Sequence, residues 1–334
     1  MGATVIDVAK IAGVSRTTVS NVFNGRAKCS EETREAVLSA AKQLGYTPNM
    51  AAKSLVTNQS HLIGLLLPSY VDNNTLTGSP FYNIILDGMY SVLREDEYYD
   101  LMIFCIPPQR VLQDVSAWMD MRNVDGIIAV GEYERSFLDE LDGRGIPVVL
   151  VDNYALNGWG HFSYLNSDDT RGGYLATKHL IARGFRSIAL CTSTLDSPIS
   201  HKRYEGYRQA LQEAGYQEIV LEKIHTPFEG GLALGEEAIQ QQVDAAFCTE
   251  DMIAVGVMNA LLRKGVRIGQ DFGLVGFDNL NISAQVYPGL TTIDQNIFAK
   301  GAIAAKTLLD ILKNDALQGS RFILPVVLVE RESA

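Results

Sequence analysis

The apolar residues of the first 60 positions recur at helical spacing in three short segments. Thr4 and Asp7 have the spacing of a capping box, which starts a helix, and Gly13 can take the left-handed conformation that ends it. Ser15 and Ser30 are capping residues for two further helices. The first expected helix starts at Thr4 and runs through Val5, Val8, Ala9 and Ile11 until Gly13. The second runs from Arg16 to about Asn24, with Val19, Val22 and Phe23 on one side, and the third from Glu31 to Leu44, with Val37, Leu38, Ala41 and Leu44 inward. Three such helices can share one small core.

After residue 61 the pattern changes to continuous apolar runs that alternate with helical segments. The first run, LIGLLLP at 62–68, lacks the alternation of an edge strand and is typical of a buried parallel strand. Further strands are expected at Leu101–Ile106, Gly126–Val130, Val148–Asp152, Ile188–Cys191, Ala245–Cys248 and Leu274–Phe277, and helices at Phe81–Glu95, Val111–Met121, Arg171–Arg183, Arg203–Ala214, Gly230–Gln241 and Asp251–Lys264. This alternation indicates parallel sheets with helices on both faces. Because it is too long for one sheet, we predict an α/β body of two similar subdomains behind an all-α head.

The first two expected helices have the spacing of a helix-turn-helix unit. Ala9 is small where the helices cross, Gly13 lies in the turn, and Val19 is a buried aliphatic residue of the second helix. The second helix then presents three side chains that can hydrogen-bond base edges in the major groove, Arg16, Thr17 and Asn21. Exposed polar residues occur on any surface helix, but together with the turn and the caps they predict a DNA-binding headpiece.

The charge of the chain is unevenly distributed. The total is −11, yet residues 1–60 contain seven lysines and arginines against four aspartates and glutamates, a net of +3 that leaves −14 for the rest. A basic head can approach phosphate while an acidic body resists non-specific contact with DNA. The length of 334 residues suits a small head and two subdomains of ordinary size.

Sequence motifs of cofactor, metal and catalytic sites are absent. The chain has no GxGxxG or GxxxxGK[ST] at a strand-to-helix turn and no GxSxG, its five histidines do not cluster, and its cysteines make no CxxC. We therefore expect no cofactor, no metal and no enzymatic activity, although missing motifs are weak evidence against an enzyme. Since no signal peptide and no apolar run of ~20 residues is found, we expect a cytoplasmic protein without a membrane partner.

The headpiece resembles the lactose-repressor family of bacterial transcription regulators. The resemblance lies in TVIDVAKIAGVSRTTVSNVFNG and in SEETREAVLSAAKQLGYTPNMAAKSL. It implies that Arg16, Thr17 and Asn21 read bases and that Thr4, Thr18, Lys28 and Asn49 lie near backbone phosphates. Arg16 is less usual for the family at its position, and an arginine most readily pairs with guanine.

The segment from Pro48 to Leu55 resembles the hinge helix of that family. Alone it is too short to be stable in water. The resemblance implies that it folds on DNA and places Leu55 as an apolar wedge in the minor groove, with Ala52 and Lys53 beside it. The alternative is that Leu55 packs on the body as an ordinary linker residue.

The body resembles the effector domain of the same family, which shares its fold with periplasmic sugar-binding proteins. The matching segments are SPFYNIILDG, VDNYALNG, NSDDTRGGYLATKHLIARG, RYEGY, EDMIAVGVMNAL, LVGFDN and PGLTTIDQ. The resemblance implies that the ligand-facing residues are Ser69, Phe81, Asp152, Arg203, Glu250 and Asp278. Asp152 and Asp278 also end expected strands, and the crevice of an open parallel sheet lies beyond the C-terminal strand ends.

Each of these residues has a plainer interpretation. The aspartates could be caps, Arg203 a surface charge and Phe81 a core residue. Glu250 departs from the family, where an asparagine or aspartate is more usual, and a glutamate only accepts hydrogen bonds. Several carboxylates with one strong donor suit polyhydroxyl ligands, so we predict a neutral sugar or glycoside rather than a phosphate or nucleobase. Tyr154, Trp159 and Tyr164 are further candidates for contact with it.

The order of head, hinge and body predicts a repressor whose operator affinity depends on a small effector. The expected regions are a headpiece at 1–47, a hinge at 48–60 and an effector-binding and dimerisation domain at 61–334. Its N-subdomain is expected at about 61–161 and 292–322, and its C-subdomain at about 162–291 and 323–334. A homodimer would recognise an inverted repeat. A solute-binding protein or an α/β enzyme that uses the same cleft remains the alternative.

Overall fold

The computed structural model of the chain divides into two units, Met1–His61 and Leu62–Ala334. It describes residues 3–23, 29–46, 60–68, 79–95, 99–106, 124–154, 161–224, 226–314 and 317–334. The expected helix Val111–Met121 and the candidate residues Lys28, Asn49, Ala52, Lys53, Leu55, Ser69 and Trp159 lie outside these ranges.

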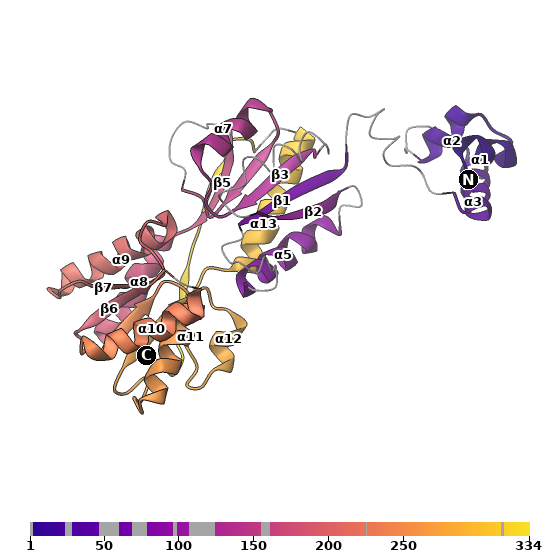
Figure 1. Cartoon of the computed structure of the whole chain (residues 1–334). Coiled ribbons are helices and arrows are strands. Elements are labelled where there is room, and N and C mark those ends of the chain that lie inside the picture. The colour runs from indigo at the N-terminus through magenta and orange to yellow at the C-terminus, as the bar shows by residue number, and fades with distance from the viewer. Residues whose placement is uncertain are drawn as a thin grey trace. The chain divides into compact units, whose positions relative to one another are not determined.

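The described residues of the first unit form three helices around one small core (Figure 1). The helices are α1 (Val5–Ala12), α2 (Arg16–Phe23) and α3 (Glu31–Leu44). The capping box of Thr4 and Asp7 and the left-handed Gly13, with φ of 67°, are both present. Leu38 was wrongly expected inside and is 46% exposed, because the inward positions Val37, Ala40 and Ala41 leave it about a third of a turn away.

The body contains two six-stranded sheets. Sheet A has the order β11-β5-β4-β3-β1-β2 and is parallel throughout. Its strands are β1 (Leu62–Pro68), β2 (Asp100–Ile106), β3 (Gly126–Val130), β4 (Val148–Val151), β5 (Ser163–Ser167) and β11 (Arg321–Leu324). One face packs on α5 (Pro80–Leu93) and α13 (Ile297–Asn314), and the other on α7 (Arg135–Gly143).

Sheet B repeats this plan with the order β12-β10-β9-β8-β6-β7, in which only the pair β10–β12 is antiparallel. Its strands are β6 (Ile188–Thr192), β7 (Ile219–Glu222), β8 (Ala245–Cys248), β9 (Gly273–Phe277), β10 (Thr291–Asp294) and β12 (Val327–Val329). The helices α8 (Asp169–Ala182) and α9 (Pro198–Ala214) cover one face. The helices α10 (Pro227–Gln240) and α11 (Asp251–Arg263) cover the other, and α12 (Asn281–Gln285) follows β9.

The predicted fold class is confirmed, with differences at the ends of elements. Helices α8, α9 and α10 begin two to five residues earlier than expected, at a cap by Asp168 or at the prolines Pro198 and Pro227, which suit a first helical position. Five strands, β5, β7, β10, β11 and β12, and three helices, α7, α12 and α13, were not among the expected elements.

Three short connections pass between the sheets, from β5 to α8, from β10 to α13, and from β11 to β12. The first two lie later in the chain than the expected subdomain boundaries after 161 and 291, because β5 completes sheet A and β10 completes sheet B. The residues of these connections, which include Asp168 and Gln295, therefore lie where the two sheets meet.

Three helix pairs in the body cross at glycines from both partners. Gly88 and Gly301 join α5 to α13, Gly173 and Gly206 join α8 to α9, and Gly231 and Gly256 join α10 to α11. A Cβ atom at any of these positions would overlap a backbone carbonyl oxygen of the partner helix. The helices of each pair are thus in backbone contact, which fixes their relative position.

We predict that Gly206→Ala lowers the stability of the body. The added Cβ would meet the Thr170 carbonyl oxygen, and overpacking of this kind costs about 1–3 kcal/mol of unfolding free energy. Thermal unfolding followed by circular dichroism measures the effect. Gly143→Ala in α7 is the control, because its Cβ has nothing within 4 Å. An equal melting temperature for Gly206→Ala and the wild type would contradict the close crossing.

Candidate DNA-binding surface and effector site

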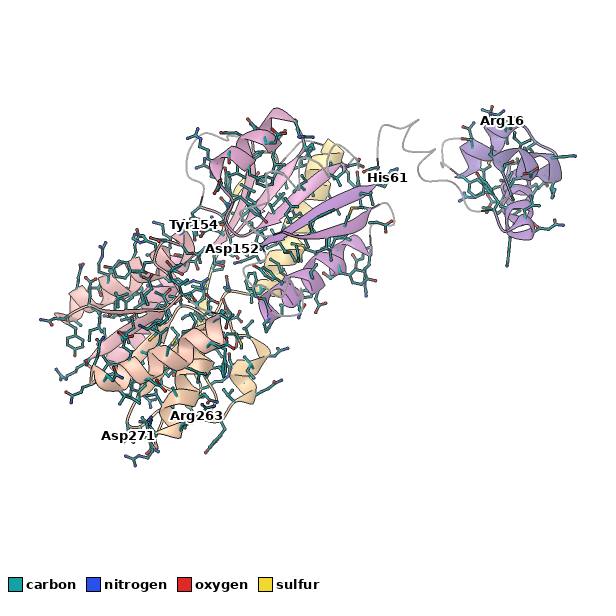
Figure 2. The ribbon with its side chains drawn as sticks, viewed as in Figure 1. Arg16, His61, Asp152, Tyr154, Arg263 and Asp271 are labelled. Atoms are coloured by element: carbon teal, nitrogen blue, oxygen red, sulfur yellow. The ribbon has the colours of Figure 1, made fainter. Side chains whose placement is uncertain are left out.

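The first turn of α2 presents polar side chains on the outer side of the headpiece. Val19 is fully buried against Val8 and Ala9, and this fixes the rotation of the helix. Arg16 and Thr17 on its other side are exposed, as Figure 2 shows for Arg16. Two polar side chains beside them, Thr18 and Asn21, are half-buried. Arg16 and Thr17 are thus exposed as predicted, whereas Asn21 is half-buried, and base reading by these residues stays a prediction.

Two of the predicted phosphate contacts already serve helix caps. The Thr4 hydroxyl donates to Asp7 Oδ2 at 2.7 Å, and the Thr4 backbone N–H donates to the same oxygen at 2.8 Å. These bonds lower the pKa of Asp7. The Thr18 backbone N–H donates to Ser15 Oγ at 3.0 Å, while the two hydroxyls lie 2.9 Å apart. Both threonines thus hold helix starts in place beside the predicted DNA surface.

In the body, two aspartates follow equivalent strands of the two sheets. Asp152 comes after β4 and Asp278 after β9, and each strand is third in its sheet. Both residues have positive φ, 53° and 114°, a region that aspartate and asparagine enter more readily than other non-glycine residues. Both are buried, at 5% and 7% exposure. The backbone thus turns sharply where each strand ends and holds a carboxylate there.

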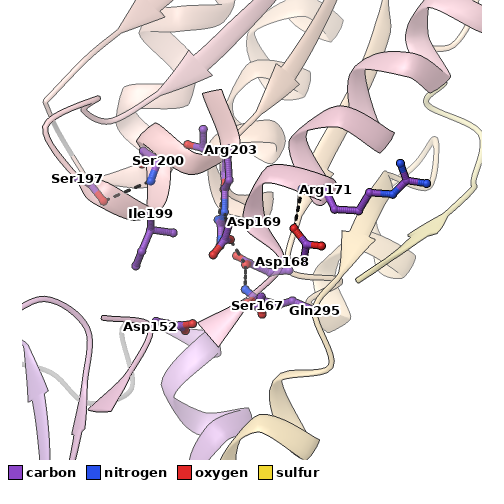
Figure 3. A network of polar contacts seen from close by, with 12 residues as sticks. Asp152, Ser167, Asp168, Asp169, Arg171, Ser197, Ile199, Ser200, Arg203 and Gln295 are labelled. Atoms are coloured by element: carbon purple, nitrogen blue, oxygen red, sulfur yellow. Dashed lines mark hydrogen bonds and ion pairs between the residues drawn. The ribbon is translucent and has the colours of Figure 1, made fainter. Parts of the chain in front are cut away.

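Arg203 from α9 pairs with Asp169 (Figure 3) and also lies near Asp278, so it connects the carboxylates on the side of sheet B. Its Nε donates to Asp169 Oδ1 at 2.8 Å and its Nη1 to the Thr249 carbonyl oxygen at 2.5 Å. Nη1 also lies 3.9 Å from Asp278 Oδ1, and the guanidinium stacks 3.6 Å from the centroid of the Phe277 ring. Burial lowers the pKa of Arg203, but the nearby aspartates outweigh it and leave the pKa raised. The cation is therefore held in place before any ligand arrives.

Lys300 from α13 connects the carboxylates on the side of sheet A. Its Nζ donates to Asp152 Oδ1 at 2.6 Å and to Gln295 Oε1 at 2.5 Å. Gln295 also accepts from the Ser167 hydroxyl at 3.0 Å, and its Nε2 donates to Asp278 Oδ1 at 2.5 Å. The hydrogen-bonded chain from Asp152 to Asp278 thus passes from one sheet to the other.

Tyr154 connects Asp169 to Ser167, which itself donates to Gln295, so the contacts return to this chain through Ser167. Its hydroxyl lies 2.6 Å from Asp169 Oδ2 and 3.1 Å from the Ser167 carbonyl oxygen, so it can donate to either. Burial and the charge of Asp169 raise the pKa of Tyr154, so the phenol keeps its proton. We call the following set the junction ring: Asp152, Lys300, Gln295, Asp278, Arg203, Asp169 and Tyr154.

Burial raises the pKa of both strand-end aspartates. For Asp152 the charge of Lys300 opposes this effect, and for Asp278 the charge of Arg203 does. Glu250 is half-buried and makes no side-chain cap bond to α11, and burial raises its pKa too. The site therefore combines carboxylate acceptors with cations already engaged by them.

Phe81 and Glu132 complete the surroundings on the side of sheet A. Phe81 at the start of α5 is half-buried, packs on the core of sheet A, and has Lys300 Nζ at 5.9 Å from its ring centroid. Glu132 follows β3 and accepts from Ser197 Oγ at 3.1 Å and from the Ile199 backbone N–H at 3.3 Å. The carboxylate of a sheet A loop thus binds the first turn of α9, a helix of sheet B.

The structure brings together four of the six predicted effector residues. Asp152, Arg203 and Asp278 belong to the junction ring, and Phe81 adjoins it. Glu250 follows β8 and influences the pKa of Asp278. Sequence reasoning missed three ring members, Lys300, Gln295 and Asp169. Of these three, only Lys300 could have been noticed in the sequence, because it is a charged residue among the apolar positions of the segment that forms α13.

Within the described ranges, no group of histidine, cysteine, aspartate and glutamate side chains has the arrangement of a metal site. The described helices also include none that is long and apolar enough to cross a membrane.

Comparison with known proteins agrees with this architecture. The model of bacterial regulatory proteins of the lacI family matches residues 4–49, and a periplasmic binding protein-like domain matches residues 177–334. The ribose operon repressor of Haemophilus influenzae is 33% identical over 99% of this chain and 98% of its own length. The transcriptional repressor PurR of the same species is also 33% identical, over 99% of this chain and 98% of its own length.

Solved structures of two other regulators have a similar fold. The lac repressor dimer bound to operator and the anti-inducer ONPF has a TM-score of 0.86 at 26% identity, covering 100% of this chain and 99% of that one. A LacI family regulator of Enterococcus faecium with bound ribose has a TM-score of 0.72 at 26% identity, covering 82% of this chain and 98% of that one.

A helix-turn-helix head on a periplasmic binding protein-like body defines a ligand-controlled, DNA-binding transcription regulator, which is not an enzyme. The chain belongs to the lacI family of bacterial regulatory proteins.

We predict that Arg203→Ala lowers the unfolding free energy of the body by about 3–5 kcal/mol, because it leaves the buried Asp169 without its cation. Chemical denaturation of the full chain measures the loss. The exposed Arg183→Ala is the control and should change stability by less than about 0.5 kcal/mol. A loss in Arg203→Ala no larger than in this control would show that the ion pair does not form.

Proposed function

We propose that this protein is a homodimeric repressor that binds an inverted-repeat operator and releases or retains it according to a sugar effector bound in the body. The observation that carries the proposal is the exposed first turn of α2 in a helix-turn-helix whose rotation is set by the buried Val19. The printed descriptions of its relatives as repressors, and of the lac repressor as an operator-bound dimer, support it. Such a regulator would act in the cytoplasm.

On the operator, we assign base reading to the exposed face of α2. Arg16 and Thr17 at its first turn can reach base edges, and Asn21 one turn later extends the same face. Thr4 and Thr18 at the helix starts would lie near phosphates, where helix N-termini favour negative charge. For Lys28, Asn49, Ala52, Lys53 and Leu55 the proposed phosphate and hinge contacts derive from the sequence.

We predict that selection from a random DNA pool recovers an inverted repeat and that binding weakens steeply as salt rises. Arg16→Ala should lower affinity for that operator by about 1–3 kcal/mol and relax the preference at one base pair of each half-site. Fluorescence anisotropy on operators substituted at each position measures both effects. Lys42→Ala in α3 is the control and should leave base preference unchanged. An unaltered preference profile in Arg16→Ala would remove its base-reading role.

In the body, we assign effector binding to the groups around the junction ring. Asp152, Asp278 and Glu250 are acceptors for hydroxyl groups, Arg203 is a cation beside them, and Phe81 offers an apolar ring face. Ser69, outside the described residues, would contribute a hydroxyl. A neutral sugar or glycoside satisfies acceptors of this kind through its own hydroxyls. The relative named a ribose operon repressor and the ribose-bound regulator of Enterococcus faecium support a sugar.

We predict that neutral sugars raise the melting temperature of the full-length protein, because a ligand that binds only the folded state stabilises it by RT ln(1 + [L]/Kd). A thermal-shift panel of pentoses, hexoses and disaccharides, with sugar phosphates and purines as matched competitors, identifies the class. Asp278→Asn removes one of the proposed acceptors and should reduce the rise in melting temperature. Stabilisation by purines or sugar phosphates alone would reject the sugar assignment.

A further inference from the structure

Lys300 is the buried cation of α13, whose other buried residues are apolar except for Thr307. Its neighbours on the inner face of α13 include Ile297, Gly301 and Ala304, and its side chain is fully buried. Lys306 on the same helix is exposed. An ammonium group taken out of water is strongly destabilising unless it is paired and hydrogen-bonded. Lys300 can therefore be buried on this face only if charged and hydrogen-bonding groups contact its ammonium group.

Those partners come from two other parts of the body. Asp152 follows β4 of sheet A, and Gln295 lies in the connection from β10 of sheet B to α13. The ring of Phe81 from α5 lies near the same ammonium. One side chain of α13 thus touches the end of a sheet A strand and the chain segment that leaves sheet B.

Lys300 also decides which way the amide of Gln295 points. An ammonium only donates, so it must face the amide oxygen, and the amide nitrogen is then directed to Asp278 at 2.5 Å. The Ser167 hydroxyl donates to the same amide oxygen and reinforces this orientation. Lys300 therefore acts on Asp278 through Gln295, as well as on Asp152 directly.

We infer that Lys300 is a positioning residue of the effector site, which favours the ionised form of Asp152 and, through Gln295, directs Asp278. In both aspartates the internal contact uses Oδ1, and we assign Oδ2 to the hydroxyl groups of an effector. Two fixed carboxyl acceptors, one from each sheet, select a ligand that donates from two hydroxyls and disfavour one with its own negative charge. The selection of a sugar rests on the proposed function, whereas the positioning of Asp152 does not.

The charged and titratable groups around Asp152 define what removal of Lys300 does. They are Lys300 from α13, Asp169 from α8, Arg203 from α9 and Tyr154 from the same loop. Lys300→Met leaves Asp152 buried near Asp169 without its closest cation, so its carboxyl should take up a proton as the pH falls. Because a raised carboxyl pKa costs stability at high pH and not at low pH, the deficit of the variant should be larger at pH 8 than at pH 5.

The test compares melting temperatures of the full chain at pH 5 and pH 8 for the wild type, Lys300→Met, Lys300→Met with Asp152→Asn, and Lys306→Met. We expect a pH-dependent deficit in Lys300→Met, recovery in the double variant, and no change in Lys306→Met. A packing role alone gives a deficit that is the same at both pH values and is not recovered by Asp152→Asn. That result would overturn the inference.

Isothermal titration with D-ribose, and with the sugar of largest shift in the panel, tests the effector role. We expect Lys300→Met to bind about 10–100-fold more weakly at pH 7.5, as for loss of a charge-assisted hydrogen bond. Wild-type affinity in Lys300→Met would overturn that role. If no sugar binds the wild type, the proposed effector class and its selection by Lys300 fail, while the melting comparison still decides whether Lys300 positions Asp152.

Discussion

The body depends on the burial of charge at the place where its two sheets meet. Asp152, Asp169, Asp278, Arg203 and Lys300 are each less than 10% exposed, and removing such groups from water is unfavourable by several kcal/mol apiece. Their ion pairs, together with hydrogen bonds to Gln295, Tyr154 and the Thr249 carbonyl oxygen, offset this cost. Because Lys300 and Gln295 connect Asp152 of sheet A to Asp278 of sheet B, any movement of one sheet relative to the other must rearrange their contacts. The same groups that hold the sheets together are therefore those that an effector can influence.

The contacts of the junction ring are of two kinds, those within one glycine-crossed helix pair and those that connect the two sheets. Asp169 and Arg203 lie on α8 and α9, whose backbones touch at Gly173 and Gly206, so their ion pair stays within one rigid helix pair. The contacts through Lys300 and Gln295 instead join sheet A to a connection from sheet B. An effector bound there as proposed can alter the second kind at little cost to the first, and through it a change of ligand state would reach both sheets of the body.

Most strands could be predicted from the sequence because a buried parallel strand is a continuous apolar run, as at 62–68 and in β3, β4, β6, β8 and β9. β5 was not, because its sequence SYLNS is polar and its place in sheet A follows from tertiary pairing. Among site residues, the strand-end aspartates could be located, since strand ends mark the ligand side of such sheets. Gln295 and Asp169 could not, because an amide and a carboxylate near a helix start are ordinary caps until the fold shows their partners.

The discontinuous sheets impose an order on folding during synthesis. The core of sheet A contains Ala304, Leu308 and Ile311 of α13, and sheet B is bordered by β12, so both halves of the body lack essential parts until residues 297–334 leave the ribosome. The three-helix head, in contrast, has all its core residues by Tyr46. A nascent chain would therefore carry a folded head while the apolar strands of the body still lack their cover. Those strands are exposed to chaperones and to aggregation for most of translation.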